Sequence, residues 1–416
     1  MNTMLARHHR RAEIMVSVQC YFRFIAIAVL QIFLFNSLHG AEVPRYEKPG
    51  IENLPMVFET VEYDVLVETV ATELDHPWGM AFLPNDNILI TERSGNLRLI
   101  RNGVLQDEPI AGTPEVFARR LSGLMDITLH PDFTNNSLVY LTYNKQMDED
   151  QQTIALARGR FDGRSLQDTR DIFVATPNAG GGSRILFADD GSLFMTVGGA
   201  YTVGRSAERA QDGTWHSGKV LRLNDDGTPF ADNPFVGQTN YHPEIYSMGH
   251  RNQQGLAIKP QTGELWAHEH APQGGDELNI IKEGRNYGWP VVSYARSYGG
   301  SRITDQPWRE EFEQPVVFWV PSIAPSGLMF YTGNQFPAWQ GHAFVGAMRV
   351  GRYNGTGHLE RIVLNENGEE TAREWLLEEL GERIRDVKQG PDGLIYVLTE
   401  TASGALLRIS PANLPK

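Results

Sequence analysis

The chain has 416 residues, of which 41% are hydrophobic and 10% aromatic, and its formal net charge is −14 at pH 7. A chain of this length and composition can bury a large core in one domain or two. The excess of acidic side chains argues against nucleic acid and anionic membrane surfaces as partners, because both attract basic proteins.

The first forty residues have the pattern of a secretory signal peptide. Four arginines make this segment basic, and an apolar run of twelve residues, FIAIAVLQIFLF, follows at 24–35, before small residues that suit a cleavage site. The run is shorter than the ~20 apolar residues that a membrane-spanning helix needs, so we expect no stable membrane anchor after cleavage. We predict that residues 1–40 are removed, that residues 41–59 form an N-terminal extension, and that the protein is exported to the periplasm or secreted.

The only cysteine, Cys20, lies inside this segment. The mature chain would therefore have no thiol, which excludes disulfides, thiolate catalysis and cysteine-ligated metals. Its stability would have to come from a hydrophobic core or from a bound ion.

A turn followed by an apolar or aromatic strand pattern occurs six times. The copies are PNDNILITE, PDFTNNSLVYLTY, ADDGSLFMTVG, PQTGELWAHE, SGLMFYTG and PDGLIYVLTE, which begin at positions 84, 131, 188, 260, 326 and 391. A four-stranded propeller blade takes roughly 40–50 residues, so this spacing fits blades that carry loop insertions. We predict an all-β fold, a six-bladed β-propeller over residues 60–416. Two β-sandwiches would also give many short strands, but a single recurrent unit argues against them.

Other strand patterns lie between and around these copies. KVLRLN at 219–224 and VVFWV at 316–320 are β-rich, and YDVLVETVATEL at 63–74 is expected to pair with GALLRISP at 404–411 and close the ring. Only ARRLSGLMDITL and REWLLEELGERI have helical periodicity, and a glycine interrupts each of them.

Two stretches are dense in polar side chains. YSMGHRNQQGLAI places Arg251 and Asn252 between two strand-like runs, which indicates either a functional site or a buried hydrogen-bond network. HEHAPQGGDELNIIKEGRNYGWP supplies the carboxylates of Glu269, Asp276 and Glu277. Oxygen ligands favour calcium over zinc, and the two histidines of this stretch are weak support for another metal.

Arg383 and Arg385 are spaced two residues apart, so they would share one face of a strand. Two like charges on one face cost free energy unless an anion lies between them. The alternative is a pair of surface arginines balanced by Glu382 and Asp386. Arg349, after an apolar strand, is uninformative by itself.

Several common cofactor and catalytic motifs are absent from the sequence. There is no GxGxxG after a strand, no Walker loop and no GxSxG elbow. These absences argue against nicotinamide and nucleotide cofactors and against a serine hydrolase.

From about residue 74 to 411 the chain resembles the soluble sugar dehydrogenases that depend on pyrroloquinoline quinone (PQQ), the glucose/sorbosone and aldose dehydrogenase family. The resemblance is carried by LDHPWGMAFLPN, GLMDITLHPDF, GKVLRLNDDGTPFADNPF, GHRNQQGLA, EHAPQGGDELNIIKEGRNYGWP, PSIAPSG and RIRDVKQGPDGLIYVLTE, in the family's order. It implies a six-bladed propeller, PQQ and calcium as cofactors, and oxidation of an aldose at its anomeric carbon to the lactone. The quinone carries the redox chemistry in such enzymes, and the electrons pass on to an acceptor that the sequence does not identify.

The resemblance also implies roles for individual residues. Arg251 would stabilise the developing oxyanion, and Asn252 would position the quinone. The remaining cofactor contacts would be Ser322, Arg349 (where the family usually has lysine), Arg383 and Arg385.

Two calcium sites follow from the same resemblance. The backbone carbonyls of Ala271 and Pro272 match those that hold calcium on the quinone. Glu277 and Tyr287 match positions that serve a second, structural calcium in some members.

The chain departs from the family pattern at three positions. Gly180, four residues before Arg184, stands where the family has the histidine that acts as general base. Leu121 stands at a glutamine position, and Gly199 at an aspartate position. The glycines around Gly180 also have a structural explanation, a bulge or a close backbone approach.

These departures leave the outcome open between three kinds of protein. The first is a PQQ-dependent sugar dehydrogenase with altered or reduced chemistry, for which His216 and His270 are the candidates for a replacement base. The second is a non-catalytic propeller that binds a ligand or serves as a scaffold, and the third is another enzyme that uses the same pocket.

Overall fold

The predicted six-fold repeat is present as six antiparallel β-sheets in the computed structural model, which describes residues 48–148, 151–199 and 205–412. The inner strand of each sheet contacts the inner strands of the two neighbouring sheets, and the last inner strand contacts the first again. In ring order these strands are β3 (Pro77–Phe82), β7 (Leu124–Leu129), β11 (Gly182–Phe187), β15 (Gln253–Ile258), β19 (Pro325–Phe330) and β23 (Ile384–Gln389). The all-β, six-bladed propeller expected from the sequence is confirmed.

Three further strands follow the inner strand outward in each of the first five sheets. They are β4 (Ile88–Glu92), β5 (Leu97–Arg101) and β6 (Val104–Leu105); β8 (Leu138–Asp148), β9 (Gln151–Phe161) and β10 (Leu166–Val174); β12 (Leu193–Val197), β13 (Lys219–Leu223) and β14 (Ile245–Met248); β16 (Leu265–Glu269), β17 (Asp276–Ile281) and β18 (Val317–Trp319); β20 (Ala343–Ala347), β21 (His358–Leu364) and β22 (Glu370–Leu376). The described helices are all short: η1 (Ile51–Asn53), α2 (Phe133–Asn136), α3 (Arg205–Glu208), η2 (Arg209–Gln211) and η3 (Pro337–Trp339).

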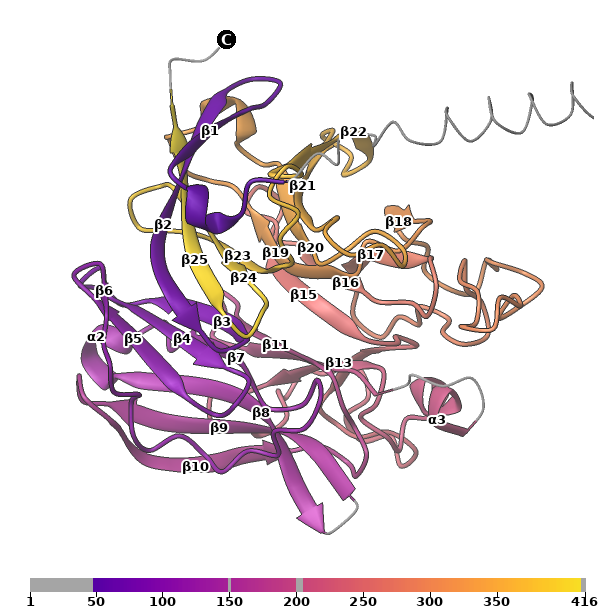
Figure 1. The fold of residues 1–416 in the computed structure, drawn as a ribbon. Helices are drawn as coiled ribbons and strands as arrows, with labels where there is room; N and C mark the ends of the chain where they lie inside the picture. Colours follow the sequence, from indigo (N-terminus) through magenta and orange to yellow (C-terminus); the bar gives the residue numbers. More distant parts are fainter. Residues whose placement is uncertain (1–47, 149–150, 200–204, 413–416) are drawn as a thin grey trace, which may run out of the picture. The chain divides into compact units, whose positions relative to one another are not determined.

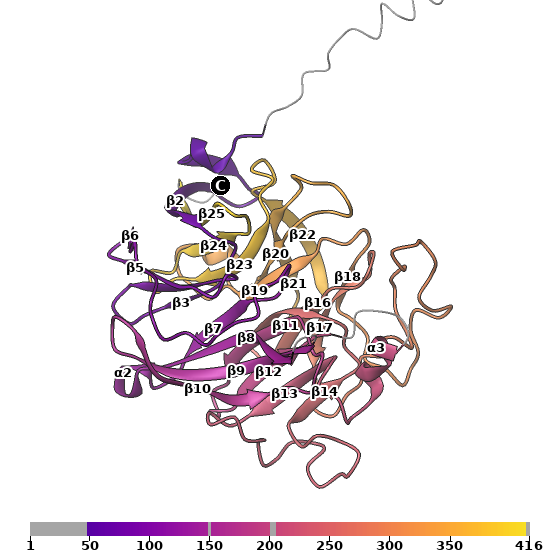
Figure 2. The ribbon, with the colours of Figure 1, turned by 60° about the horizontal axis from the view of Figure 1, so that its bottom comes forward.

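The sixth sheet closes the ring by joining strands from both ends of the propeller sequence. Its order is β1 (Met56–Glu59), β2 (Asp64–Leu74), β25 (Gly404–Pro411), β24 (Ile395–Thr399) and β23. β2 and β25 are antiparallel, with Val65 opposite Pro411 and Val67 opposite Ile409. Both ribbon views show the indigo β2 running beside the yellow β25 (Figure 1 and Figure 2). The predicted pairing of these segments is confirmed, and β1, which precedes residue 60, is the outermost strand of this sheet.

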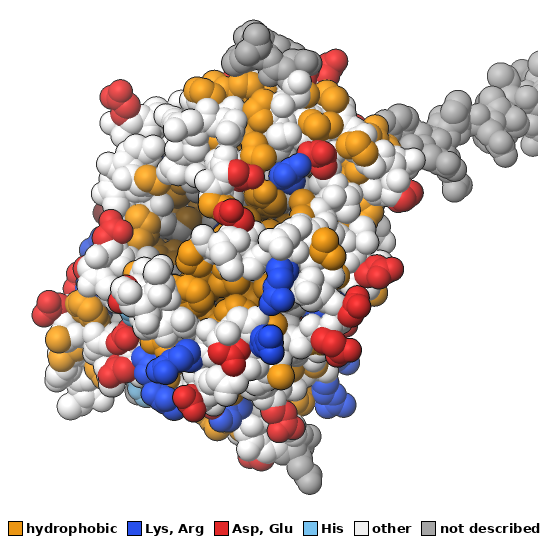
Figure 3. Space-filling view, turned by 90° about the vertical axis from the view of Figure 1, so that its left-hand side faces the viewer, with side chains coloured by type: hydrophobic (Ala, Val, Ile, Leu, Met, Phe, Trp, Pro, Cys, Tyr) orange, Lys and Arg blue, Asp and Glu red, His pale blue; other side chains and the backbone are white. Residues whose placement is uncertain are grey.

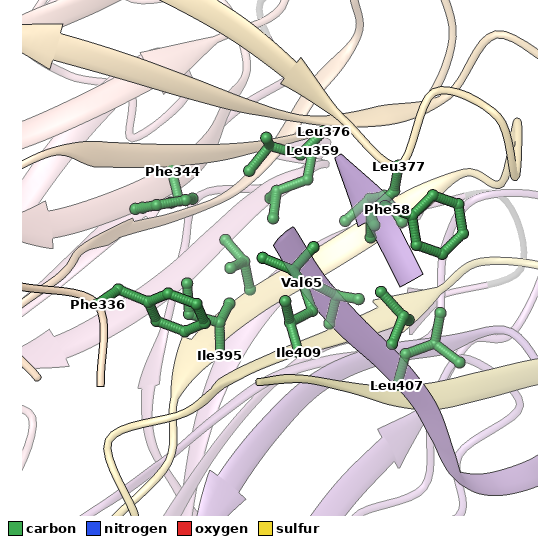
Figure 4. Close-up of a cluster of buried hydrophobic side chains, with 14 of the residues drawn as sticks. Phe58, Val65, Phe336, Phe344, Leu359, Leu376, Leu377, Ile395, Leu407 and Ile409 are labelled. Carbon is green, nitrogen blue, oxygen red and sulfur yellow. The ribbon is translucent and has the colours of Figure 1, made fainter. Parts of the chain in front are cut away.

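A buried hydrophobic cluster joins the closing sheet to its neighbour. Val65 and Val67 alternate with less buried residues along β2, as expected for a strand with one face toward a core. Figure 4 shows Val65 beside Ile409, in a cluster with Phe344 and Leu359 from the adjacent sheet. The cluster therefore packs the closing strands against the fifth blade.

The sequence pattern assigned most elements correctly but misplaced three. Five of the six repeats form the second strand of a blade, whereas SGLMFYTG lies in the inner strand β19. KVLRLN and VVFWV form β13 and β18 as predicted. The two helical candidates are wrong, because ARRLSGLMDITL leads into β7 and REWLLEELGERI starts in β22. Pairing with neighbouring strands outweighs the weak helical periodicity of both segments.

The predicted signal peptide lies outside the described residues. Among the residues described, no helix has the length and apolarity to cross a bilayer.

Candidate active site

A cavity of about 920 Å³ opens at the end of the ring where the inner strands begin. All six sheets reach it with residues at or just before the start of their inner strands: Trp78, Met125, Gly181, Asn252, Ala324 and Arg385. The volume lies at the upper end of the range for cavities that enclose a small-molecule ligand.

The lining of this cavity is strongly basic. Six arginines contribute to it, and none of the described lining residues is acidic. The outer surface differs, since acidic and basic side chains are interspersed over the face that carries β5, β6 and α2 (Figure 3). A basic cavity in a chain of net charge −14 is suited to an anionic ligand. The arginines are Arg119, Arg120, Arg251, Arg349, Arg383 and Arg385.

A single carboxylate, Glu400, lies behind three arginines. Arg93 Nη1 and Arg383 Nε donate to its two oxygens at 2.7 and 2.8 Å, and Arg385 Nη2 lies 3.7 Å from Oε1. Burial works against the charge of Glu400, but the guanidiniums of Arg385 and Arg383 outweigh it, so its pKa is lowered. Burial, only partly offset by Glu400, lowers the pKa of Arg385 to about 10, which leaves it charged at neutral pH. Three guanidinium charges face the single carboxylate charge of Glu400, so the net positive charge on this side of the cavity favours the binding of further anionic groups.

Arg251 and Asn252 are fixed by a buried polar network. The Arg251 backbone N–H donates to Glu269 Oε2, and its Nη1 donates to the His270 carbonyl at 2.8 Å. Asn252 Oδ1 accepts from the Gly182 N–H at 2.9 Å and from Gln254 Nε2 at 3.0 Å. Both side chains line the cavity. The segment that contains Arg251 and Asn252 therefore forms a buried hydrogen-bond network and also part of the cavity wall.

The glycine cluster has two different explanations along its length. Gly181 and Gly182 have positive φ angles of 73° and 69°, and a Cβ on Gly182 would lie 2.6 Å from Gly198 N. Glycine is therefore required at both positions. Gly180 lines the cavity and is not among the residues with positive φ. Its φ angle is therefore not in the region that favours glycine, so backbone conformation does not explain the absence of a histidine there.

Gly199, which also departs from the family pattern, lies close to Gly180. Its φ is 103°, and a Cβ there would lie 2.7 Å from the backbone nitrogen of Gly180. An aspartate at 199 would require a shift of this backbone. The two departures from the family pattern are thus physically linked, whereas Leu121 is an exposed side chain on the cavity rim.

Of the two histidines that were candidates for a replacement base, only His270 lines the cavity. Its Nε2 donates to the Pro325 carbonyl at 2.7 Å, which leaves Nδ1 as the unprotonated nitrogen. Burial lowers the pKa of His270 to about 3, so the ring is neutral but a weak base.

His216 belongs to a separate cluster with His242 and Glu244. The Thr176 N–H donates to His216 Nδ1 at 2.9 Å, so the proton of the neutral ring is on Nε2, which faces Glu244 Oε1 at 2.7 Å. Both ring nitrogens are engaged. Metal binding through Nε2 would require the loss of this proton while Nδ1 stays an acceptor, which argues against a metal here.

Of the two residues predicted to hold calcium on the quinone, only one lines the cavity. Ala271 lines the cavity, while Pro272 and the predicted cofactor contact Ser322 are not among the lining residues. Ser322 Oγ donates to Asp276 Oδ2 at 2.5 Å, and the Ala271 N–H donates to Asp276 Oδ1 at 2.9 Å. Burial raises the pKa of Asp276 to about 6.

A second, small cavity lies beside the first and contains Glu269, Glu277 and Tyr287. Glu269 and Glu277 are directly opposite each other on β16 and β17. Burial, together with the neighbouring Glu269 carboxylate, raises the pKa of Glu277. Two like charges in this position are destabilising unless a cation lies between them.

The sequence analysis missed a buried charge triad between the inner strands β7, β11 and β23. Arg184 Nη1 lies 2.9 Å from Asp386 Oδ1 and 3.2 Å from Asp126 Oδ1, and all three side chains are buried. Arg184 Nη2 also donates to the Arg385 carbonyl at 3.1 Å. The guanidinium lies 4.2 Å from the ring of Trp78, which lines the cavity. Arg184 thus ties three inner strands to the cavity wall.

Comparison with known proteins decides the family. A sequence model described as "Glucose / Sorbosone dehydrogenase" matches residues 74–408. The chain belongs to the glucose/sorbosone dehydrogenase family. It is 38% identical over 359 residues to aldose sugar dehydrogenase YliI of Escherichia coli (strain K12), a match that covers 84% of this chain and 94% of that protein.

Two solved structures place this family member among the sugar dehydrogenase propellers. The soluble aldose sugar dehydrogenase from Escherichia coli in the apo form has a TM-score of 0.78 to this chain and is 37% identical to it. The match covers 83% of this chain and 99% of that chain. The PQQ-bound aldose sugar dehydrogenase from Streptomyces coelicolor has a TM-score of 0.67 and 26% identity, with coverage of 83% and 98%. The resemblance stated from the sequence motifs is confirmed.

Proposed function

We propose that this chain binds PQQ in the arginine-lined cavity and oxidises an aldose at its anomeric carbon to the lactone, at a rate limited by the missing base. The observation that carries the proposal is the excess of guanidinium groups around Glu400. When bound, PQQ supplies the acceptor for the hydride that leaves the anomeric carbon. The small-molecule substrate would thus be a sugar, as it is for the similar aldose sugar dehydrogenases.

The residues of the cavity fit a planar, polycarboxylate cofactor. Arg385 Nε is buried and has no hydrogen-bond partner among the described residues, although its Nη1 donates to Ser326 Oγ at 3.2 Å. An unpartnered buried donor costs free energy that an incoming carboxylate would offset. Arg349 and Arg383 would hold further carboxylates, since the planar fork of arginine suits these groups.

The residues around the reacting end would bind and orient the sugar. Arg251 would donate to the oxygen at which negative charge develops, and its link to the His270 carbonyl keeps its guanidinium in place. Asn252 would position the cofactor, with its carboxamide fixed by Gly182 and Gln254. The proton of the anomeric hydroxyl has no strong base to accept it at Gly180, so it would pass to solvent or to the weakly basic His270.

Calcium is proposed at two positions. One ion would be held against the cofactor by the backbone carbonyls of Ala271 and Pro272, where it would polarise the quinone. The other would lie between Glu269 and Glu277, near Tyr287, where it would relieve the repulsion between the two carboxylates.

Export is part of the proposal, because the first forty residues have the signal-peptide pattern. The mature protein, beginning near residue 41, would act in the periplasm or outside the cell.

Titration of the purified mature protein with PQQ in the presence of calcium tests the cofactor assignment. Arg383→Gln should weaken PQQ binding roughly 10- to 100-fold, because a charge-assisted hydrogen bond to a carboxylate is lost. Arg383 is partly exposed, so the variant is expected to fold, and Arg101→Gln, far from the cavity, is the control. The absence of PQQ binding by the wild-type protein would overturn the proposal.

Dye-linked dehydrogenase activity across a panel of aldoses tests the reaction. Turnover that requires both PQQ and calcium is expected. If PQQ binds but no aldose is oxidised, the chain is the alternative that Gly180 favours, a non-catalytic ligand-binding propeller or scaffold.

Removal of calcium should destabilise the wild-type protein but not Glu277→Gln. We expect a saturating calcium concentration to raise the Tm of the wild type by roughly 3–5 °C. The variant has one carboxylate fewer opposite Glu269, so without calcium it should be at least as stable as the wild type, and calcium should have little effect. Melting curves with and without a chelator measure both quantities. An equal calcium response in the two proteins would contradict an ion between these carboxylates.

A further inference from the structure

Two arginines at the mouth of the cavity have no role in the proposed cofactor site. Arg119 and Arg120 lie between β6 and β7, are exposed and line the cavity. Among the described residues, neither guanidinium has an ion pair or a hydrogen bond to a side chain or carbonyl, and Arg119 lies 5.7 Å from the ring of Phe117. Both positive charges are therefore available to a ligand.

The backbone holds this pair in a defined turn. Arg120 has a φ of 54°, which is uncommon for a residue with a side chain. The Ser122 N–H donates to the Arg119 carbonyl at 2.9 Å, and the Leu124 N–H donates to the Arg93 carbonyl at 3.2 Å. A Cβ on Gly123 would overlap the Arg93 carbonyl oxygen. This packing fixes the turn against the first blade, so the two side chains start from an ordered backbone.

The position of this turn in the ring separates it from the other arginines. It leads into β7, whose neighbours in the ring are β3 and β11, and Gly180 lies just before β11. Arg349 follows β20 of the fifth sheet, Arg383 immediately precedes β23 of the sixth, and Arg385 is the second residue of β23. The pair Arg119 and Arg120 therefore belongs to the Gly180 side of the cavity, where the proposed reaction places the sugar.

We propose that the substrate is an anionic aldose, a sugar that carries a carboxylate or a phosphate away from its anomeric carbon. This inference rests on the proposed function. With the anomeric carbon near Gly180, the anionic group would reach the guanidiniums of Arg119 and Arg120. No described acidic residue lines the cavity to repel it, and guanidinium groups bind both carboxylate and phosphate through paired hydrogen bonds.

The test compares the affinities of three sugars that differ in charge. Glucuronate, glucose 6-phosphate and glucose are titrated by calorimetry into protein loaded with PQQ and calcium, without an electron acceptor, so that at most one turnover follows. We expect at least one of the two anions to bind roughly 10-fold or more tightly than glucose. Which anion is preferred distinguishes a uronic acid from a sugar phosphate. Added salt should reduce the preference.

Two double variants test whether the preference for an anionic sugar depends on Arg119 and Arg120. Arg119→Gln combined with Arg120→Gln should remove the advantage of the anion and leave the affinity for glucose unchanged. Arg101→Gln with Arg160→Gln, two exposed arginines outside the cavity, removes the same charge and should preserve the advantage. Melting curves establish that both double variants are folded.

Two results would overturn the inference: equal affinities for the three sugars, or an anion preference that persists in the Arg119 and Arg120 double variant. The proposed function fails in a different way. In that case PQQ itself does not bind, which the cofactor titration detects before any sugar is added, and the inference fails with it.

Discussion

Replacing Gly180 with histidine should raise the rate of aldose oxidation by roughly 100- to 10,000-fold, the contribution expected of a positioned general base. Gly180 lines the cavity and has no positive φ angle, so an L-residue side chain fits its backbone. Neutral imidazole accepts a proton far better near neutral pH than His270, whose pKa burial lowers to about 3. The measurement is kcat with a dye acceptor, at saturating PQQ and calcium.

Gly180→Phe is the matched control, because it adds a ring of similar size without a basic nitrogen. An equal gain in both variants would show that filling the cavity, and not proton transfer, is responsible. No gain in Gly180→His, with PQQ bound, would mean that the pocket has diverged beyond this one residue. The contact between Gly199 and Gly180 is where such divergence is expected, since an aspartate at 199 is part of the family pattern.

Arg184→Met should lower the free energy of unfolding by about 3–5 kcal/mol, because it leaves two buried carboxylates without their counterion. Asp126 and Asp386 are each about 1% exposed, and no described cation other than Arg184 forms an ion pair with either. A loss of this size is a large part of the 5–15 kcal/mol that typically stabilises a folded domain. Urea unfolding monitored by tryptophan fluorescence measures it.

The pH dependence of the Arg184→Met effect identifies its cause. Burial raises the pKa of Asp386 and the Arg184 charge opposes this rise, so removing Arg184 should raise the pKa further, and the variant should gain stability relative to the wild type as the pH falls. The loss should therefore be smaller at about pH 5 than at about pH 8. Adding Asp126→Asn and Asp386→Asn to the variant should recover part of the stability. A loss that is independent of pH would point to packing against Trp78 instead of charge.

The fold was predictable because each blade repeats a local pattern that a sequence displays. The closing pair β2 and β25 was also predictable, since Val65 and Val67 alternate in the way that a half-buried strand requires. The position of β19 within its blade was not. SGLMFYTG has the same turn and apolar pattern as the second strands, and only its partners β20 and β23 reveal that it is the inner strand.

The site was partly predictable from the family motifs, which named six residues that line or flank one cavity. The partners of those residues were not predictable. The anion behind Arg383 and Arg385 was expected to be a ligand or, in the alternative, Glu382 and Asp386. Within the protein their ion-pair partner is Glu400, which follows the next strand along the chain and which the sequence analysis did not name. Its proximity depends on the pairing of β23 with β24, whose register shifts between Ile384 and Asp386, next to the cavity-lining Arg385.

The closing sheet constrains the order in which the molecule can be completed. β2 is synthesised before the first full blade, yet its partner β25 follows every other strand in the chain. Until the ribosome has made β25, one edge of β2 has no strand to pair with, and β23 and β24 lack the strand that joins them to it. A nascent chain can form its middle blades early but cannot become a ring before the final strand is released. Ring closure is therefore a step that can follow only the completion of the whole propeller sequence.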